Sequence, residues 1–166
     1  MASVKRNYGK ESVKTAGNIY CGPAALSVIT GYDTDEIAKE ILRVRGKGYL
    51  PANSVTGAYM SELKAVLERL DCEAQNQFII KGSLYWLLST QLNGPAWYIV
   101  SVPGHFVTIQ VISNTEKYLC DNHTKHQINA GMSARLGQQV FEVLKLTRLR
   151  KKQPTFNLWA VEGLGL

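Results

Sequence analysis

Residues 17–26 read Gly-Asn-Ile-Tyr-Cys-Gly-Pro-Ala-Ala-Leu, a polar stretch that leads into a cysteine and then into a small apolar run. The run predicts a helix over 22–30, because proline is favoured in the first turn of a helix, where its missing N–H costs nothing. Cys21 therefore stands at the start of a helix. The positive end of the helix dipole favours the thiolate, which is the nucleophilic form of cysteine. We expect Cys21 to be a nucleophile rather than a buried, inert thiol.

A cysteine nucleophile needs a base that takes its proton and a group that orients that base. His105 is the candidate base, at the start of an alternating β-rich run over 105–112. Asp121 is the preferred orienter and Asn122 the alternative, because either side chain accepts a hydrogen bond from the far imidazole nitrogen. The competing interpretations of these residues are a core histidine and an Asp-Asn turn after a strand.

These motifs resemble those of the papain-like cysteine peptidases: Cys-Gly-Pro-Ala-Ala-Leu opens a helix, Gly-His-Phe-Val opens a strand, and Asp-Asn ends the next strand. The nearest likeness is to the compact peptidases that remove double-glycine leaders from bacteriocins, which share the chain order Cys, His, Asp. The resemblance implies a Cys21–His105–Asp121 triad in a cleft between N-terminal helices and an antiparallel sheet. It also implies a thiol hydrolase that cleaves a peptide or isopeptide bond. An amidase or acyl transferase would use the same triad.

One departure from the family concerns the oxyanion hole. Such enzymes usually carry a Gln several residues before the Cys, and no Gln occurs before Cys21 in this chain. Asn18 is the nearest side-chain amide, so we expect the oxyanion to be held by the Cys21 N–H and Asn18. The other role for Asn18 is to shape the turn before the helix. The missing Gln favours a second hypothesis, a catalytically weak or inactive papain-like fold that serves as a binding module.

The hydrophobic periodicity predicts helices first and strands second, which is typical of an α+β fold. Apolar residues at helical spacing predict one helix after residue 33 and another that Ser61 caps. A shorter helix is expected over 83–92. The expected strands are 73–80, 96–102, 105–112, 117–121, 140–146 and 156–161. The second and third of these are expected to pair antiparallel.

The chain has 166 residues and a hydrophobic content of 45%, which suits one globular domain. We expect a polar lead-in over 1–17 and a single domain over 18–166. No segment is long and apolar enough to span a membrane, and the N-terminus has no apolar signal core. Three widely spaced cysteines do not form a disulfide framework and suit a reducing compartment. The sequence therefore predicts a cytoplasmic protein, and the resemblance to the peptidases implies a phage or bacterial origin.

The net charge of +6 gathers in basic groups near the N-terminus, at 43–47 and at 145–152. Such runs are ordinarily solvated surface. A binding module would use them for an acidic protein or nucleic acid, whereas the hydrolase hypothesis predicts a peptide or protein substrate.

A metal site is a further interpretation of the cysteines and histidines. Cys120, His123 and His126 have a spacing that zinc could use, but a structural zinc site needs four ligands. Cys72 is the one remaining cysteine outside Cys21. We therefore expect no metal and no cofactor.

Overall fold

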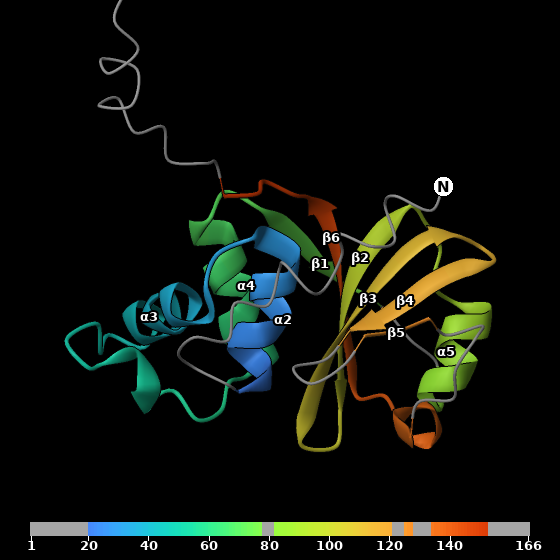
Figure 1. Cartoon of the computed structure of the whole chain (residues 1–166), viewed down its shortest axis with the longest axis horizontal. Coiled ribbons are helices and arrows are strands. Elements are labelled where there is room, and N and C mark those ends of the chain that lie inside the picture. The colour runs from blue at the N-terminus through green and yellow to red at the C-terminus, as the bar shows by residue number, and fades with distance from the viewer. Residues whose placement is uncertain (1–19, 78–81, 121–124, 128–133, 153–166) are drawn as a thin grey trace, which may run out of the picture.

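The computed structural model describes residues 20–77, 82–120, 125–127 and 134–152. Within them a six-stranded sheet separates two helical layers (Figure 1). Two helices lie against one face of the sheet with a third packed on them, and a fourth helix lies against the other face. This arrangement confirms the expected α+β class. Among the described helices, none combines the length and apolar character that a membrane crossing requires.

The sheet has the strand order β1-β6-β2-β3-β4-β5, and every neighbouring pair is antiparallel. The strands are β1 Glu73–Asn76, β2 Ala96–Val102, β3 His105–Ser113, β4 Glu116–Cys120, β5 Lys125–Gln127 and β6 Glu142–Arg148. β2 and β3 form the predicted hairpin, in which Val102 pairs with His105. Gly104 turns the hairpin with a φ of 63°, a left-handed conformation that glycine adopts without strain. The sequence did not predict β5, which is too short to show alternation, and the expected strand over 156–161 lies outside the described residues.

The α-helices are α2 Cys21–Thr30, α3 Thr34–Val44, α4 Met60–Arg69 and α5 Leu84–Thr90, with short 3₁₀ helices η1 Ala52–Ser54 and η2 Ala134–Gly137. The prediction that Ser61 caps α4 is wrong. The N-cap residue is Tyr59 and the helix begins at Met60, two residues earlier than predicted, because the backbone N–H of Tyr59 donates to the Glu62 carboxylate at 2.8 Å. A glutamate at the third helical position fixes the start of a helix in this way.

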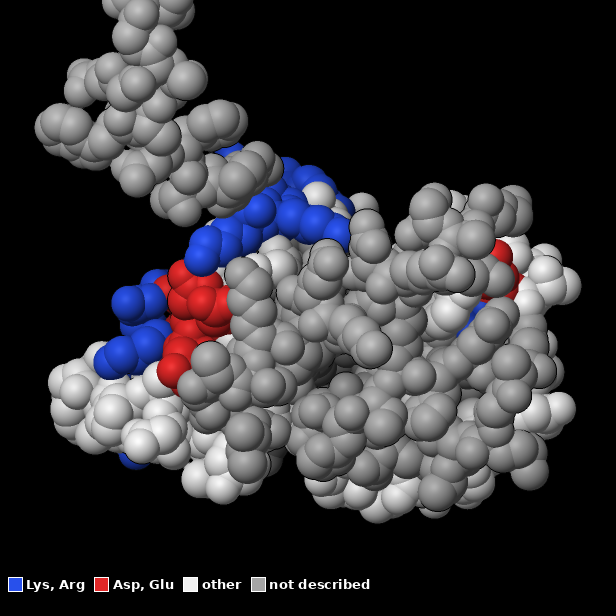
Figure 2. Space-filling view, viewed as in Figure 1, with Lys and Arg blue, Asp and Glu red and all other residues white. Residues whose placement is uncertain are grey.

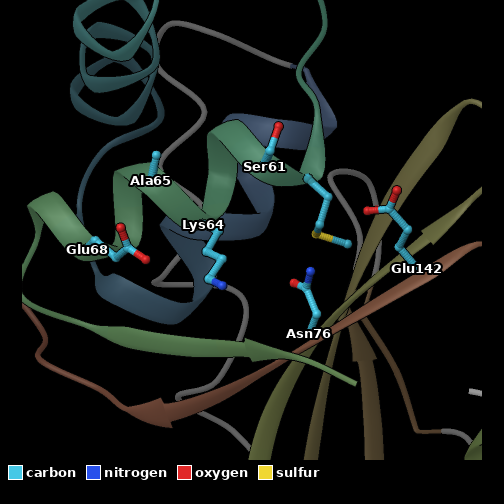
Figure 3. Close-up of a pocket in the computed structure, with 7 residues that line it drawn as sticks. Ser61, Lys64, Ala65, Glu68, Asn76 and Glu142 are labelled. Carbon is cyan, nitrogen blue, oxygen red and sulfur yellow. The ribbon is translucent and has the colours of Figure 1, made fainter. Parts of the chain in front are cut away.

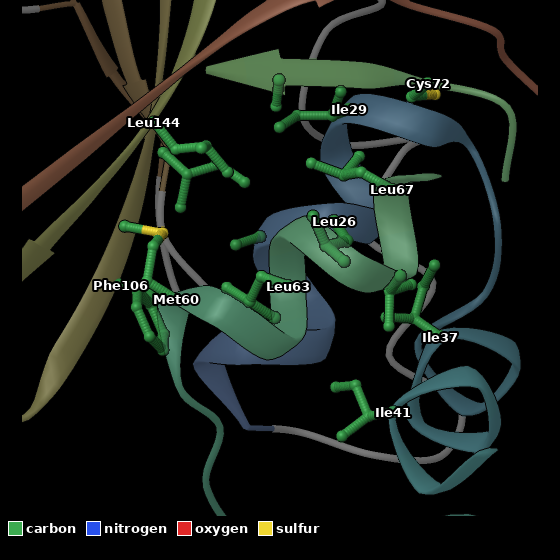
Figure 4. Packing of buried hydrophobic residues seen from close by; sticks show 14 of the residues in the cluster. Leu26, Ile29, Ile37, Ile41, Met60, Leu63, Leu67, Cys72, Phe106 and Leu144 are labelled. Atoms are coloured by element: carbon green, nitrogen blue, oxygen red, sulfur yellow. The ribbon is translucent and has the colours of Figure 1, made fainter. Parts of the chain in front are cut away.

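The face that α2, α3 and α4 cover holds the larger buried cluster (Figure 4). α2 and α4 pack their apolar stripes on the sheet, whereas α3 packs its stripe on α2 and α4. The principal members of the cluster are Leu26, Ile29, Ile37, Ile41, Leu63, Leu67, Ile99, Phe106 and Leu144. Burial of such side chains stabilises the fold by about 1.5–3 kcal/mol each, so this face fixes α2 firmly against the sheet.

β3 is buried on both faces, which links the two layers. Val107, Ile109 and Val111 pack with α5, as their predicted alternation requires. Thr108 on the other face is fully buried, and its hydroxyl donates to the carbonyl of Ala25 at 3.2 Å. This hydrogen bond attaches the strand that begins at His105 to the helix that begins at Cys21.

Candidate active site

A pocket of ≈ 570 Å³ lies where the β2–β3 hairpin turns beside the first turn of α2. It brings together two of the residues that the sequence singles out, Cys21 and His105. The lining residues are Tyr20, Cys21, Thr56, Gly57, Ala58, Ser101, Val102, Gly104, His105, Phe106 and Phe141. We call this the catalytic pocket, after the chemistry that its cysteine and histidine could perform.

Cys21 is the first residue of α2 and is half-buried, whereas the nine residues that follow it in the helix are buried. Tyr20, the N-cap residue, makes no side-chain hydrogen bond to the helix, and Pro23 has no N–H. The first N–H groups of a helix have no partners within the helix, so the N–H of Cys21 can serve a ligand in the pocket. The thiol is thus partly accessible at the positive end of a helix.

His105 is the first residue of β3, and its Nε2 atom is buried. Neighbouring residues on a strand point to opposite faces, yet His105 and Phe106 both line the pocket, as do Ser101 and Val102. The pocket therefore takes in the end of the hairpin rather than one face of the sheet. This explains how a histidine in line with Val107 reaches the side of the molecule that carries Cys21.

A loop at 56–58 forms the wall opposite the hairpin, and an ion pair holds it in place. Arg45 donates from Nε to Glu62 Oε1 at 2.7 Å and from Nη2 to Oε2 at 2.9 Å. The same Nη2 donates to the carbonyl of Gly57 at 2.5 Å. These hydrogen bonds, which Arg45 donates and the Glu62 carboxylate accepts, lower the pKa of Glu62 and raise the pKa of Arg45. The charged pair thereby fixes the loop to the start of α4.

Gly22 allows this loop to approach α2 closely. A Cβ placed on Gly22 would lie 3.0 Å from the Cβ of Ala58 and 3.7 Å from a methyl carbon of Leu63. A side chain next to Cys21 would therefore press on the loop that bounds the pocket. Sequence reasoning missed the roles of Arg45 and Glu62, although the glycine after the cysteine signalled a close approach.

Several predicted site residues lie outside the described residues: Asn18, Asp121, Asn122 and His123. β4 ends at Cys120, the residue before Asp121, so the described chain leads up to the expected orienter. The third member of the triad and the side-chain part of the oxyanion hole stay predictions.

The described residues contain no group of three His, Cys, Asp or Glu side chains that could hold a metal ion. Cys120 packs with Val28 and Tyr118 in a small buried cluster, and Cys72 belongs to the large cluster beneath α2–α4. The side chain of His126 is not described.

Three cations of the C-terminal basic group form ion pairs within the chain. Figure 2 shows basic and acidic side chains next to each other on the surface of the molecule. Arg148 and Arg150 donate to the two carboxylate oxygens of Asp71 at 2.6 and 2.5 Å. Lys152 donates to Glu36 at 2.7 Å, and this hydrogen bond raises the pKa of Lys152. These cations fasten the chain after β6 to the helical layer.

No protein-family model matches the chain, and no curated protein sequence matches it.

Proposed function

We propose that the chain is a cytoplasmic, papain-like thiol hydrolase that cleaves a peptide or isopeptide bond. One observation carries the proposal: Cys21, at the first turn of α2, and His105, at the start of β3, line the same pocket. A cysteine at a helix N-terminus beside a histidine is the arrangement that activates a thiol for attack on a carbonyl.

The reaction runs through two acyl transfers. The Cys21 thiolate attacks the scissile carbonyl after His105 has taken the thiol proton, and His105 then gives that proton to the leaving amine. A thioester remains on Cys21. Water, deprotonated by His105, attacks the thioester and releases the carboxylic acid and the thiol. The Cys21 N–H, with Asn18, stabilises the oxyanion in both steps.

Asp121 is the proposed orienter of His105, with Asn122 as the alternative. A carboxylate would both fix the imidazole tautomer and stabilise the imidazolium that forms in each step, whereas an amide would do only the first.

The second hypothesis is a binding module for an acidic protein or nucleic acid. It is supported by the basic groups and by the missing Gln. The C-terminal basic group, however, pairs with acidic residues of the chain itself through Arg148, Arg150 and Lys152, which leaves less positive charge for a partner. We therefore rank it second.

The test is cleavage of a proteome-derived peptide library, read by mass spectrometry. Cys21→Ser and His105→Ala should each lower cleavage by about 10²-fold or more, because one removes the nucleophile and the other the base. Asp121→Asn should also lower it. Cys120→Ala is the matched control and should retain cleavage in a folded protein. Cleavage that survives Cys21→Ser would refute the proposal.

A further inference from the structure

A second pocket, of ≈ 500 Å³, lies between α4 and the strands β1 and β6 (Figure 3). Its lining residues are Met60, Ser61, Lys64, Ala65, Glu68, Asn76 and Glu142. We call it the polar pocket. It shares no lining residue with the catalytic pocket, but both are bounded by the same sheet and the same stretch of chain.

The sheet side of the two pockets is continuous. Ser101 on β2 pairs with Phe106 on β3 and with Glu142 on β6. Residues directly opposite each other on neighbouring strands share a face of the sheet. Phe106, Ser101 and Glu142 therefore form one row, of which the first two members line the catalytic pocket and the third lines the polar pocket.

The helical side is continuous as well. Ala58 lines the catalytic pocket, and Met60, two residues further along, lines the polar pocket. Met60 and Phe106 belong to the same buried cluster beneath the groove (Figure 4). The two pockets thus lie end to end between the sheet and the segment 56–68, and we call the two together the groove.

The polar end of the groove presents four side chains that make no hydrogen bond or ion pair within the described residues: Lys64, Glu68, Asn76 and Glu142. Lys64 and Glu68 stand four residues apart on α4, where opposite charges attract and offset one another. Glu142 stands on β6, across the pocket from α4 (Figure 3). Lys64, Glu68 and Glu142 together give the lining of this pocket a net charge of −1.

We propose that the groove binds an extended polypeptide whose lysine or arginine side chain pairs with Glu142 while the scissile bond lies at Cys21. This proposal rests on the proposed function and names its substrate class. Phe106 and Glu142 lie two strands apart in the sheet, a distance of about 10 Å. About three residues of an extended peptide span this distance. The basic residue therefore lies two to four residues from the scissile bond.

The experiment uses peptide electrophiles that fix the register by alkylating Cys21. One series carries a chloromethyl ketone at the carboxyl end of a tetrapeptide, and the other carries a chloroacetyl group at the amino end. Each position is filled in turn with lysine, norleucine or glutamate. The thiolate displaces chloride from either probe, and the second-order rate of labelling is read from the intact protein mass. Labelling requires no hydrolysis, so this measurement is independent of peptide cleavage.

In the wild-type protein, lysine at one position two to four residues from the electrophile should speed labelling by about 3- to 10-fold over norleucine. Glu142→Gln should remove this preference, and Glu142→Lys should transfer it to glutamate. Glu73→Gln, which changes an exposed glutamate on β1 outside the groove, should leave it unchanged.

Equal rates for lysine and norleucine at every position would overturn the proposal, and so would a lysine preference that survives Glu142→Gln. A preference that depends on Glu142 in a protein that cleaves no peptide would support the groove and refute the hydrolase.

Discussion

The two faces of the sheet differ in the partners that they give to buried charged side chains. On the groove face, Arg45 and Glu62 form a partly buried ion pair that also holds the Gly57 carbonyl. On the α5 face, Lys117 lies buried beneath the helix with no acidic partner among the described residues, and its ammonium donates to the carbonyl of Leu88. Leu88 lies near the end of α5, where backbone carbonyls lack helical partners.

This difference separates an open site from a closed core. The wall of a groove must keep its position although no other element covers it. The bidentate ion pair between Arg45 and Glu62, with the hydrogen bond to the Gly57 carbonyl, holds the wall in that position. The α5 face contains only packed core, and there a single cation, Lys117, pairs with a backbone carbonyl at the end of the helix. Burial lowers the pKa of Lys117, so its charge destabilises the fold even as its hydrogen bond supports α5.

The largest expected effect compares the cysteines of these environments. Cys21 borders the groove, whereas Cys72 is 1% and Cys120 2% exposed. Iodoacetamide at neutral pH should alkylate Cys21 on the order of 10²-fold faster than either, because the buried thiols react only when the structure opens locally. Mass spectrometry of the digested protein gives the three rates. In denaturant the rates should converge, and equal rates in the folded protein would contradict the distinction between the two environments.

Much of this comparison follows from sequence, because helical and strand periodicity are local. The Gly-Pro pair predicted α2 over 22–30, one residue short of its observed start at Cys21. The β2–β3 hairpin and the alternation of Val107, Ile109 and Val111 were predictable from residue spacing. Periodicity does not reveal that Thr108, a polar residue on the opposite face of β3, is buried against α2. That burial depends on which helix packs there.

The walls of the groove were beyond sequence reasoning for the same reason. Glu142, Ser101 and Phe106 form one row because β6 crosses to lie beside β2, a pairing between distant segments. Arg45 and Glu62 belong to two predicted helical regions, but their contact depends on how α3 and α4 pack. The sequence identified the candidate nucleophile and base, whereas the surfaces around them arise from long-range packing.

The second largest effect is the loss of stability expected from Glu62→Gln. At neutral pH this substitution should lower the free energy of unfolding by about 1–2 kcal/mol, because Arg45 then pairs with a neutral amide instead of a carboxylate. The folded pKa of Glu62 lies below its ordinary value, so the stabilisation is complete above that ordinary value and is lost as pH falls through the folded pKa. Urea unfolding between pH 7 and pH 3 should show the two proteins converging in acid. Glu68→Gln, on the same helix, is the control and should run parallel to the wild type.

For Lys117→Met we expect a smaller change in the free energy of unfolding, with the opposite dependence on pH. The folded pKa of Lys117 lies below its ordinary value, so the folded state loses its proton first as pH rises. The wild-type protein should therefore gain stability relative to the variant across the window that ends near the ordinary pKa of lysine. Urea unfolding from pH 7 to pH 11 measures this gain. Lys64→Met, at a half-exposed position on α4, should show none, and parallel curves for Lys117→Met and the wild type would refute the burial argument.

The smallest effect is expected for Asp71→Asn. Asp71 contacts both Arg148 and Arg150, and the hydrogen bond from Arg150 holds the pKa of Asp71 below its ordinary value. The side chain of Asp71 is 52% exposed, so water and salt screen these pairs. Any contribution of these pairs to stability is present at pH values above the ordinary pKa of the carboxyl, and it is lost as pH falls through the folded pKa.

The chain after β6 is also held by contacts that carry no charge. The backbone N–H of Arg150 donates to the sulfur of Cys72 at 3.3 Å, and that of Lys152 donates to the carbonyl of Thr30 at 2.8 Å. Asp71→Asn leaves both in place, and asparagine tolerates the left-handed conformation of residue 71, where φ is 61°. The thermal midpoint at physiological salt should therefore match that of the wild type, with a small decrease only at low salt. A decrease at physiological salt as large as that of Glu62→Gln would show that an exposed pair can hold a segment as firmly as the partly buried pair beside the groove.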